Sequence, residues 1–190
     1  ARLGSVNQRL YDAGETLARH LLSHIPDGAH ILMTMHDEGV SALEDRLRGE
    51  QAILKGKNVG RAVVVSGNDS VKGAEVIARA LKDHPEIRIV LGTGQSDTEA
   101  GGRAIEASFA GQGYWSAGFD LSPTTLRLIQ EGHMRCTVDQ QPYIQGFYPV
   151  VQLTLHLRYG IVPSDIDAGA AIIDKTNVDQ VMELSQRDYR

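Results

Sequence analysis

Short apolar runs along this chain alternate with longer segments in which apolar residues recur every three or four positions. The short runs are rich in β-branched residues and have the length of buried strands, whereas the longer segments have the spacing of amphipathic helices. The predicted strands span residues 30–35, 61–65, 87–91, 114–119, 134–139 and 170–173. Strands that alternate with helices form βαβ units with right-handed crossovers. The pattern therefore predicts an α/β fold with a doubly wound, Rossmann-like parallel sheet covered by helices on both faces.

Helix-start signals agree with this division of the chain. Residues 41–44 and 96–99 have the sequence of capping boxes, Ser70 is a predicted N-cap, and Ser122 precedes a proline at the first helical position. A long helix is expected over 142–159. No repeat, low-complexity tract or linker divides the sequence. Residues 1–190 are therefore predicted to form a single α/β lobe.

The overall charge and apolar content exclude several classes of partner. The chain of 190 residues carries a formal net charge of −5 and has no basic cluster, which disfavours nucleic acid. No apolar run approaches the roughly 20 residues that a membrane helix requires. The single cysteine, Cys136, lies in a predicted strand and is expected to be a small buried side chain.

Neither a cofactor nor a metal ion is predicted. Gly92-Thr-Gly94 resembles the start of a dinucleotide loop, but Asp97 stands where the third glycine belongs, and its charge would repel a phosphate. His20 and His24 stand four residues apart with no acidic or cysteine partner near them in the sequence, so a solvated helix face is the simpler interpretation.

The turns that follow the predicted strands hold the candidate chemistry. Ligands of open parallel sheets bind at the carboxyl ends of the strands. These turns carry His36, Glu38, Asn68, Asp69, Gln95, Asp120, Gln140 and Gln141. They contain no Lys, no Arg and no recognisable catalytic triad. Carboxylates and carboxamides suit a neutral ligand with many hydroxyl groups, although Asn68 and Asp69 are better explained as turn and N-cap residues than as ligand contacts.

The string from Gly118-Phe119-Asp120 through Ser122-Pro123 to residues 137–146 resembles the C-terminal half of type I periplasmic binding proteins. The similarity is greatest to the ribose, xylose and related sugar binders. Residues 3–6 with 11–14 resemble the place where that family crosses from its first lobe into its second. The resemblance implies two lobes that close on a small sugar or polyol, a non-catalytic periplasmic protein, and docking on the membrane permease of an ABC transporter.

The resemblance also assigns candidate contacts. Asp120 matches the carboxylate that binds sugar hydroxyls, and Gln140 matches a carboxamide at the edge of the cleft. Either Gly94 or Gln95 occupies a position where the family often has Asn, and Gln95 is favoured because it has a side chain to offer. The loop from His36 to Glu38 matches a contact loop and is expected to lie opposite the other three residues. The arginine of the family pattern is absent from this loop, where Glu44 is the nearest residue.

The length of the chain departs from the family. Relatives have a whole first lobe ahead of Leu3, and their counterpart of residues 142–160 packs on that lobe. The chain opens at Ala1 with neither an initiator Met nor a signal peptide, as a processed or cut N-terminus would; a fragment and a lone lobe both fit. Without a first lobe the apolar 142–160 segment needs cover, and a homodimer by exchange of this segment is expected in preference to a fold-back.

Two other functions compete with a transport role. The effector-binding domain of a LacI-type sugar-responsive transcription regulator shares the fold and also carries Asp at the position of Asp120. The string Gln140-Gln141-Pro142-Tyr143 is more typical of the transport proteins. A nucleotide-dependent enzyme on a Rossmann-like sheet is the third hypothesis, because the fold alone does not fix function.

Overall fold

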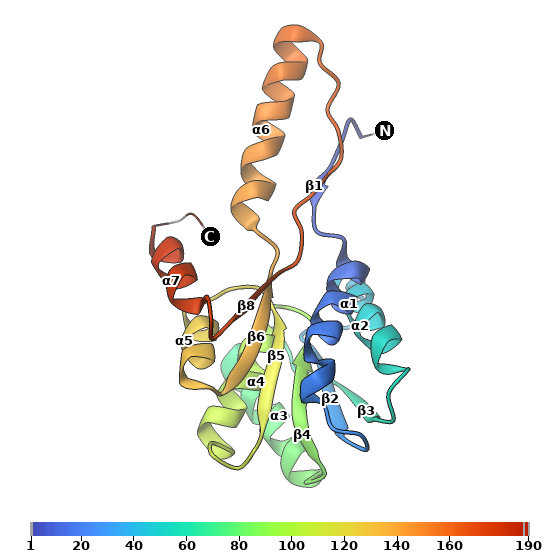
Figure 1. The fold of residues 1–190 in the computed structure, drawn as a ribbon, viewed down its shortest axis with the longest axis vertical. Coiled ribbons are helices and arrows are strands. Elements are labelled where there is room, and N and C mark those ends of the chain that lie inside the picture. The colour runs from blue at the N-terminus through green and yellow to red at the C-terminus, as the bar shows by residue number, and fades with distance from the viewer. Residues whose placement is uncertain (1, 188, 190) are drawn as a thin grey trace.

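A computed structural model describes residues 2–187 and 189. Its central layer is a six-stranded sheet with the order β3-β2-β4-β5-β6-β8, and a separate two-stranded ribbon pairs β1 with β7 (Figure 1). The strands are β1 (Val6–Asn7), β2 (His30–Met35), β3 (Gly60–Val65), β4 (Ile87–Gly92), β5 (Trp115–Phe119), β6 (Met134–Asp139), β7 (Ile166–Asp167) and β8 (Ala171–Asp174). The helices are α1 (Leu10–Leu21), the 3-10 turn η1 (Leu22–His24), α2 (Ser41–Leu54), α3 (Ser70–Asp83), α4 (Gln95–Ser108), α5 (Pro123–Glu131), α6 (Pro142–Tyr159) and α7 (Val178–Gln186).

Helices cover both faces of the sheet, as the sequence pattern predicts. Alternate residues of a strand point to opposite faces, so neighbouring residues of β2 enter different cores. Ile31 and Met33 pack with α1 and α2, whereas Leu32 packs with α3 and α4. A third cluster joins α5 and α7 to β6 and β8. Cys136 is fully buried, and burial raises the pKa of its thiol to about 12, so it belongs to the core as expected.

The last strand of the sheet runs against the others. β8 pairs with β6 in antiparallel register, with Val138 opposite Ile172, whereas the sequence pattern predicts an all-parallel sheet. The chain leaves β6 at its carboxyl end, makes α6, and returns to the sheet from the same end. Because no helix carries it back across a face, the returning strand enters in the opposite direction.

The cap residues differ in detail from the sequence prediction. Ser122 caps α5 by accepting a hydrogen bond from the Thr125 amide at 3.0 Å, as expected. Asp69 rather than Ser70 caps α3. α4 begins two residues early, with Gly94 as its N-cap, because the Asp97 carboxylate accepts hydrogen bonds from the amides of Thr93 and Gly94.

Two glycines bring α1 and α2 into backbone contact. A Cβ on Gly14 would lie 2.1 Å from the carbonyl oxygen of Arg46, and one on Gly49 would lie 2.1 Å from that of Tyr11. No larger residue fits at either position without separating the helices. The close crossing fixes the height of α2 above the sheet and therefore the direction in which the Arg46 side chain enters the lobe.

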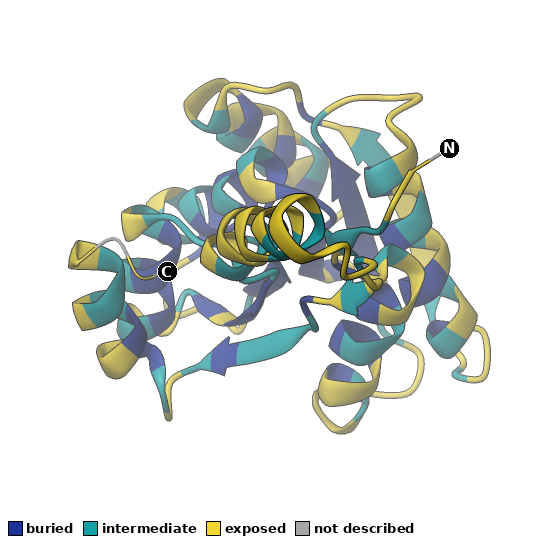
Figure 2. Ribbon diagram, turned by 90° about the horizontal axis from the view of Figure 1, so that it is seen from above, coloured by how far each residue is buried: buried dark blue, intermediate teal, exposed yellow. Residues whose placement is uncertain are grey.

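α6 projects away from the lobe beside the β1–β7 ribbon (Figure 1), and the view along it shows a mostly exposed surface with some residues of intermediate burial (Figure 2). None of its residues is buried, and Leu157 and Tyr159 are 83% and 69% exposed. The helix has therefore not folded back onto its own lobe. None of the described helices has both the length and the apolar content needed to cross a membrane.

Candidate functional site

Four adjacent strands deliver polar residues to one rim of the sheet. β2, β4, β5 and β6 are consecutive neighbours and run in the same direction, so their carboxyl ends meet at this rim. His36 follows β2, Gly94 and Gln95 follow β4, Asp120 follows β5, and Gln140 follows β6. The strand-end rule therefore places these candidate residues correctly at one edge.

Asp120 is the centre of this rim. Its backbone is left-handed, with φ of 69°, an uncommon conformation for a residue other than glycine. Its amide donates to the carbonyl of Val138 at 2.8 Å, and the hydroxyl of Thr137 donates to its carbonyl at 2.8 Å. Its side chain, 15% exposed, accepts a 2.7 Å hydrogen bond from Nε2 of Gln140. Burial raises the pKa of this carboxyl, while the charge of Arg46 acts in the opposite direction.

Arg46 reaches the rim from α2 and is the residue that the sequence interpretation missed. Its side chain is 4% exposed, and the guanidinium carbon lies 4.4 Å from the ring centre of Phe119. The oxygen of Gln8 accepts from Nε at 3.2 Å and from Nη2 at 2.9 Å. The carbonyl of Thr93 accepts from Nη1 at 3.0 Å. The carboxylate of Asp120 accepts two longer bonds, of 3.3 and 3.5 Å.

An arginine therefore does reach the rim, from α2 rather than from the 36–38 loop in which the family pattern places it. A guanidinium has five N–H donors, and the hydrogen bonds to Gln8, Thr93 and Asp120 use all of them. The sequence did hold a signal: Arg46 lies three residues after Leu43 and three before Gly49, both of which face inward. A charged residue on the inner face of a helix requires a buried partner.

His36 lies on the same rim, after β2, and is fixed by Asp97. Its Nδ1 is 2.9 Å from a carboxylate oxygen of Asp97, and this hydrogen bond raises the pKa of the imidazole. Asp97 is fully buried and also accepts hydrogen bonds from the hydroxyl of Thr34 and the amides of Thr93 and Gly94. These two amides are already bonded to a carboxylate, and its negative charge would repel a phosphate at the start of α4.

A hollow of about 310 Å³ opens beside Asp120. Gln95, Asp120 and Gln140 line it, together with apolar residues such as Leu121 and Pro142. The hydroxyl of Ser185, on α7, also lines this hollow and is a buried group without a hydrogen-bond partner among the described residues. The structure therefore brings three of the predicted contact residues around one space.

The remaining predicted residues fall outside that hollow. Gly94 is buried beneath His36, since an added Cβ would lie 2.5 Å from the imidazole Cε1, so Gln95 rather than Gly94 presents a side chain. His36 lies on the same rim rather than opposite it, because β2 and β4 are neighbours in the sheet. Glu38 is exposed in the turn after β2, and no hydrogen bond joins its side chain to the described residues of the rim.

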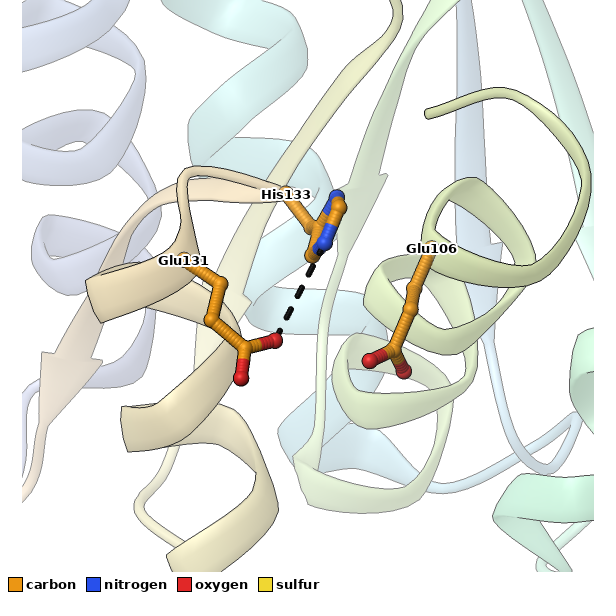
Figure 3. A group of neighbouring side chains, drawn as sticks. All are labelled: Glu106, Glu131 and His133. Atoms are coloured by element: carbon orange, nitrogen blue, oxygen red, sulfur yellow. Dashed lines mark ion pairs between the residues drawn. The ribbon is translucent and has the colours of Figure 1, made fainter. Parts of the chain in front are cut away.

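A cluster that resembles a metal site among the described residues is better explained by ion pairs. Glu106, Glu131 and His133 approach one another at the ends of α4 and α5 (Figure 3). Arg127 lies against both carboxylates, 2.6 Å from Glu106 and in a short contact with Glu131, so its positive charge already occupies the place of a cation between them.

His20, on α1, and His24, at the end of the 3-10 turn η1, have partners that sequence proximity could not reveal. Asp174 on β8 comes within 3.9 Å of His20, and Arg135 lies 3.5 Å from Nδ1 of His24. The expectation that no acidic residue is near was therefore wrong for His20. A cation beside His24 disfavours a metal ion at that imidazole.

Comparison with known proteins identifies the family. The sequence profile of the periplasmic binding protein domain matches residues 1–160. The xylose/arabinose-binding protein XylF of Sulfolobus acidocaldarius is 26% identical over 191 residues, covering 97% of this chain and 47% of that protein. The chain therefore spans about half the length of this curated relative.

Solved structures give the same result. A carbohydrate transporter from Acidothermus cellulolyticus in complex with myo-inositol is 27% identical, with a TM-score of 0.82, over 99% of this chain and 65% of that one. The glucose-galactose binding protein GanP from Geobacillus stearothermophilus is also 27% identical, with a TM-score of 0.81, over 93% of this chain and 64% of that one. A periplasmic ribose ABC transporter from Conexibacter woesei, 21% identical with a TM-score of 0.86, has the same fold. With its α/β fold and a profile match over most of its length, this chain belongs to the periplasmic binding protein family.

Proposed function

We propose that this lobe binds a small sugar or polyol, without catalysis, as part of the solute-binding component of an ABC-type uptake system. The observation that carries the proposal is the group of Asp120, Gln140 and Gln95 around one hollow, with Arg46 bonded to Asp120 behind it. Relatives that are named for xylose and arabinose binding, or solved with myo-inositol, support the same class of ligand.

The chemistry of the rim suits hydroxyl groups. A carboxylate has about four acceptor positions, and Arg46 and Gln140 leave Asp120 with capacity for a hydroxyl donor. Its two bonds to Arg46 are the longest that the guanidinium makes, so a ligand oxygen could replace either at small cost. Gln95 is exposed beside it and offers both a donor and an acceptor.

Binding in the periplasm and docking on a membrane permease belong to the same proposal. They are supported by the family and by relatives named as ABC transporter proteins. The chain covers only 47% of XylF and 64–65% of the two solved structures that are 27% identical to it. These relatives therefore contain regions that the chain does not match. We propose that such a region, a first lobe, supplies the other half of the sugar site and the surface that covers α6.

The proposal predicts weak sugar binding by the 190-residue chain alone. A single rim leaves the opposite face of the sugar in water, and each lost hydrogen bond costs about 1 kcal/mol. Three or four such losses convert a micromolar affinity into a millimolar one. Nuclear magnetic resonance detects binding in that range, whereas micromolar affinity of this chain in calorimetry would contradict the proposed division of the site.

The test is a chemical-shift titration with D-xylose, L-arabinose and myo-inositol. Saturable shifts are expected at the amides of residues 94–95, 120–121 and 140–141, and Asp120→Asn should abolish them. Asp83→Asn is the matched control, because Asp83 is exposed at the far end of α3. If all three compounds give no saturable shifts at the rim, or Asp120→Asn titrates like wild type, the proposed function is wrong.

A further inference from the structure

Gln8 occupies a position between the β1–β7 ribbon and the candidate sugar site. It follows β1 directly and is 2% exposed, although it is a polar residue. Its carboxamide oxygen accepts from both Nε and Nη2 of Arg46, at 3.2 and 2.9 Å. Its carboxamide nitrogen donates to the carbonyl of Gly169 at 3.0 Å, two residues after β7 ends.

These partners fix the orientation of the carboxamide. A flipped side chain would place its NH₂ group against the guanidinium donors and its oxygen against a carbonyl oxygen, losing every bond. Gln8 therefore has one arrangement in which it satisfies Arg46 on one side and the ribbon on the other. Because its bonds to Arg46 are shorter than those of Asp120, Gln8 does more than the carboxylate to set the plane of the guanidinium.

The ribbon itself is held by a continuous set of bonds. The amide of Ile166 donates to Ser5 at 2.7 Å, and that of Ala168 donates to Asn7 at 3.0 Å. Gly169 has φ of 83°, which directs its carbonyl toward Gln8 in a conformation that favours glycine. On the other side, the carboxamide of Gln141 donates to the carbonyl of Ala168 at 2.9 Å.

We propose that Gln8 is a positioning residue that transmits the geometry of the β1–β7 ribbon to the Arg46–Asp120 pair. A displacement of Gly169 would move the carboxamide, and the carboxamide would carry the guanidinium with it, since Arg46 has no spare donor for a replacement bond. The arrangement of two chain segments outside the sugar site thus determines how the site presents its carboxylate. The effect on sugar affinity rests on the proposed function; the effect on Arg46 does not.

The test uses a residue that touches neither Arg46 nor sugar. Gly169→Ala should strain the backbone and move the carbonyl that Gln8 contacts, and so shift the Nε–H resonance of Arg46 and the amide resonance of Asp120. Gly160→Ala is the matched control, because Gly160 has a similar φ of 69° at the end of α6, with no atom within 4 Å of an added Cβ. Equal, small shifts of the Arg46 resonance in both variants would overturn the proposal.

Substitutions of Gln8 distinguish transmission of the ribbon geometry from a simple hydrogen bond that supports Arg46. Gln8→Glu keeps acceptors for Arg46 but has no donor for Gly169, whereas Gln8→Met loses both contacts. The Arg46 Nε–H signal should persist in Gln8→Glu and be lost in Gln8→Met, while D-xylose binding should weaken about tenfold or more in both. Asn7→Ser, an exposed neighbour on the ribbon, should match wild type.

Unchanged affinity in folded Gln8→Glu would show that Gln8 only supports Arg46, and would contradict transmission. If wild type itself binds none of the sugars, the proposed function fails. The comparison of the Arg46 resonance in Gly169→Ala and Gly160→Ala still decides whether the ribbon positions the guanidinium.

Discussion

α1 and α6 are both helices beside the same lobe, yet they have opposite relations to it. α1 has 12 residues with its apolar side chains on one stripe, and Ala13, Gly14, Leu17, Ala18 and Leu21 are all buried. α6 has 18 residues, is apolar on more than one face, and buries none of them. Apolar content therefore does not determine burial within this lobe. A stripe marks a helix whose partner is the sheet, whereas apolar residues all round a helix mark one whose partner is elsewhere.

The largest expected effect on the free energy of unfolding is at Arg46, on the helix α2 that packs against α1. Arg46→Met should lower the free energy of unfolding by about 3–5 kcal/mol, because it leaves the carboxylate of Asp120 and the carboxamide of Gln8 buried without their partner. Chemical denaturation at neutral pH measures the loss. Arg79→Met, on the exposed face of α3, should change stability by no more than about 0.5 kcal/mol. Equal effects of the two substitutions would mean that the Arg46 network contributes little.

A pair of glycines tests the comparison directly. Gly14→Ala should destabilise the lobe by about 1–3 kcal/mol, since its Cβ would overlap the backbone of α2. Gly146→Ala, in α6, should stabilise by about 0.5–1 kcal/mol, because no atom lies within 4 Å of an added Cβ and alanine favours a helix. Thermal and chemical unfolding should therefore show changes of opposite sign. A loss of stability in Gly146→Ala would indicate that α6 packs more closely than it does here.

Glu50, on α2, makes the stability of the lobe depend on pH. Its side chain is fully buried one turn after Arg46, and neither oxygen has a hydrogen-bond partner among the described residues. Burial raises the pKa of this carboxyl well above its ordinary value of 4.5, so the folded state keeps the proton after the unfolded state has lost it. Glu50 therefore lowers stability by about 1.4 kcal/mol for each pH unit from 4.5 up to its folded pKa.

The matching experiment follows stability between pH 4 and pH 8. Glu50→Gln should remove this fall with rising pH and should be more stable than wild type at pH 7, while the two proteins converge near pH 4. Glu38→Gln, on an exposed carboxylate, should follow the wild-type curve. A wild-type curve that rises from pH 4.5 to pH 7 in parallel with Glu50→Gln would refute a neutral, buried Glu50.

The smallest effect on stability is expected on α6, where the readout is association. Phe147→Gln with Leu157→Gln should change the free energy of unfolding by less than about 0.5 kcal/mol, because both side chains are already exposed. If α6 mediates the homodimer expected from the sequence, sedimentation across a concentration series should show self-association that these substitutions abolish. A wild-type chain that stays monomeric at high micromolar concentration would eliminate that homodimer and leave a first lobe as the proposed cover.

The sequence predicts the sheet well because strand periodicity and helix periodicity are local signals. All five parallel strands and the α5 cap lie where expected, within a residue. The direction of β8 could not be predicted this way, since it depends on which end of the sheet the chain re-enters after α6. The start of α4 was missed because the carboxylate of Asp97 takes the amides of Thr93 and Gly94, a choice that a capping-box pattern does not reveal.

The rim was predictable only in part. Asp120, Gln140 and Gln95 follow strands, so the strand-end rule and the family resemblance both find them. Arg46 comes from α2 and is placed by the crossing of α1 with α2, whereas Gln8 comes from the end of β1 in the ribbon, so neither follows a strand of the six-stranded sheet. The family resemblance places an arginine in the contact loop of residues 36–38, whereas the Arg46 side chain extends from the second turn of α2.

The hydrogen bond between Gln8 and Gly169 spans 161 positions of the sequence and so bears on the order in which the lobe folds. The strands from β2 to β6 lie between these two residues and pair over far shorter separations, which close faster. The five parallel strands and the α1–α2 crossing therefore form first, with Arg46 already beside Asp120. The β1–β7 ribbon closes across the longer separation, so the guanidinium receives its final alignment in the last stage of folding.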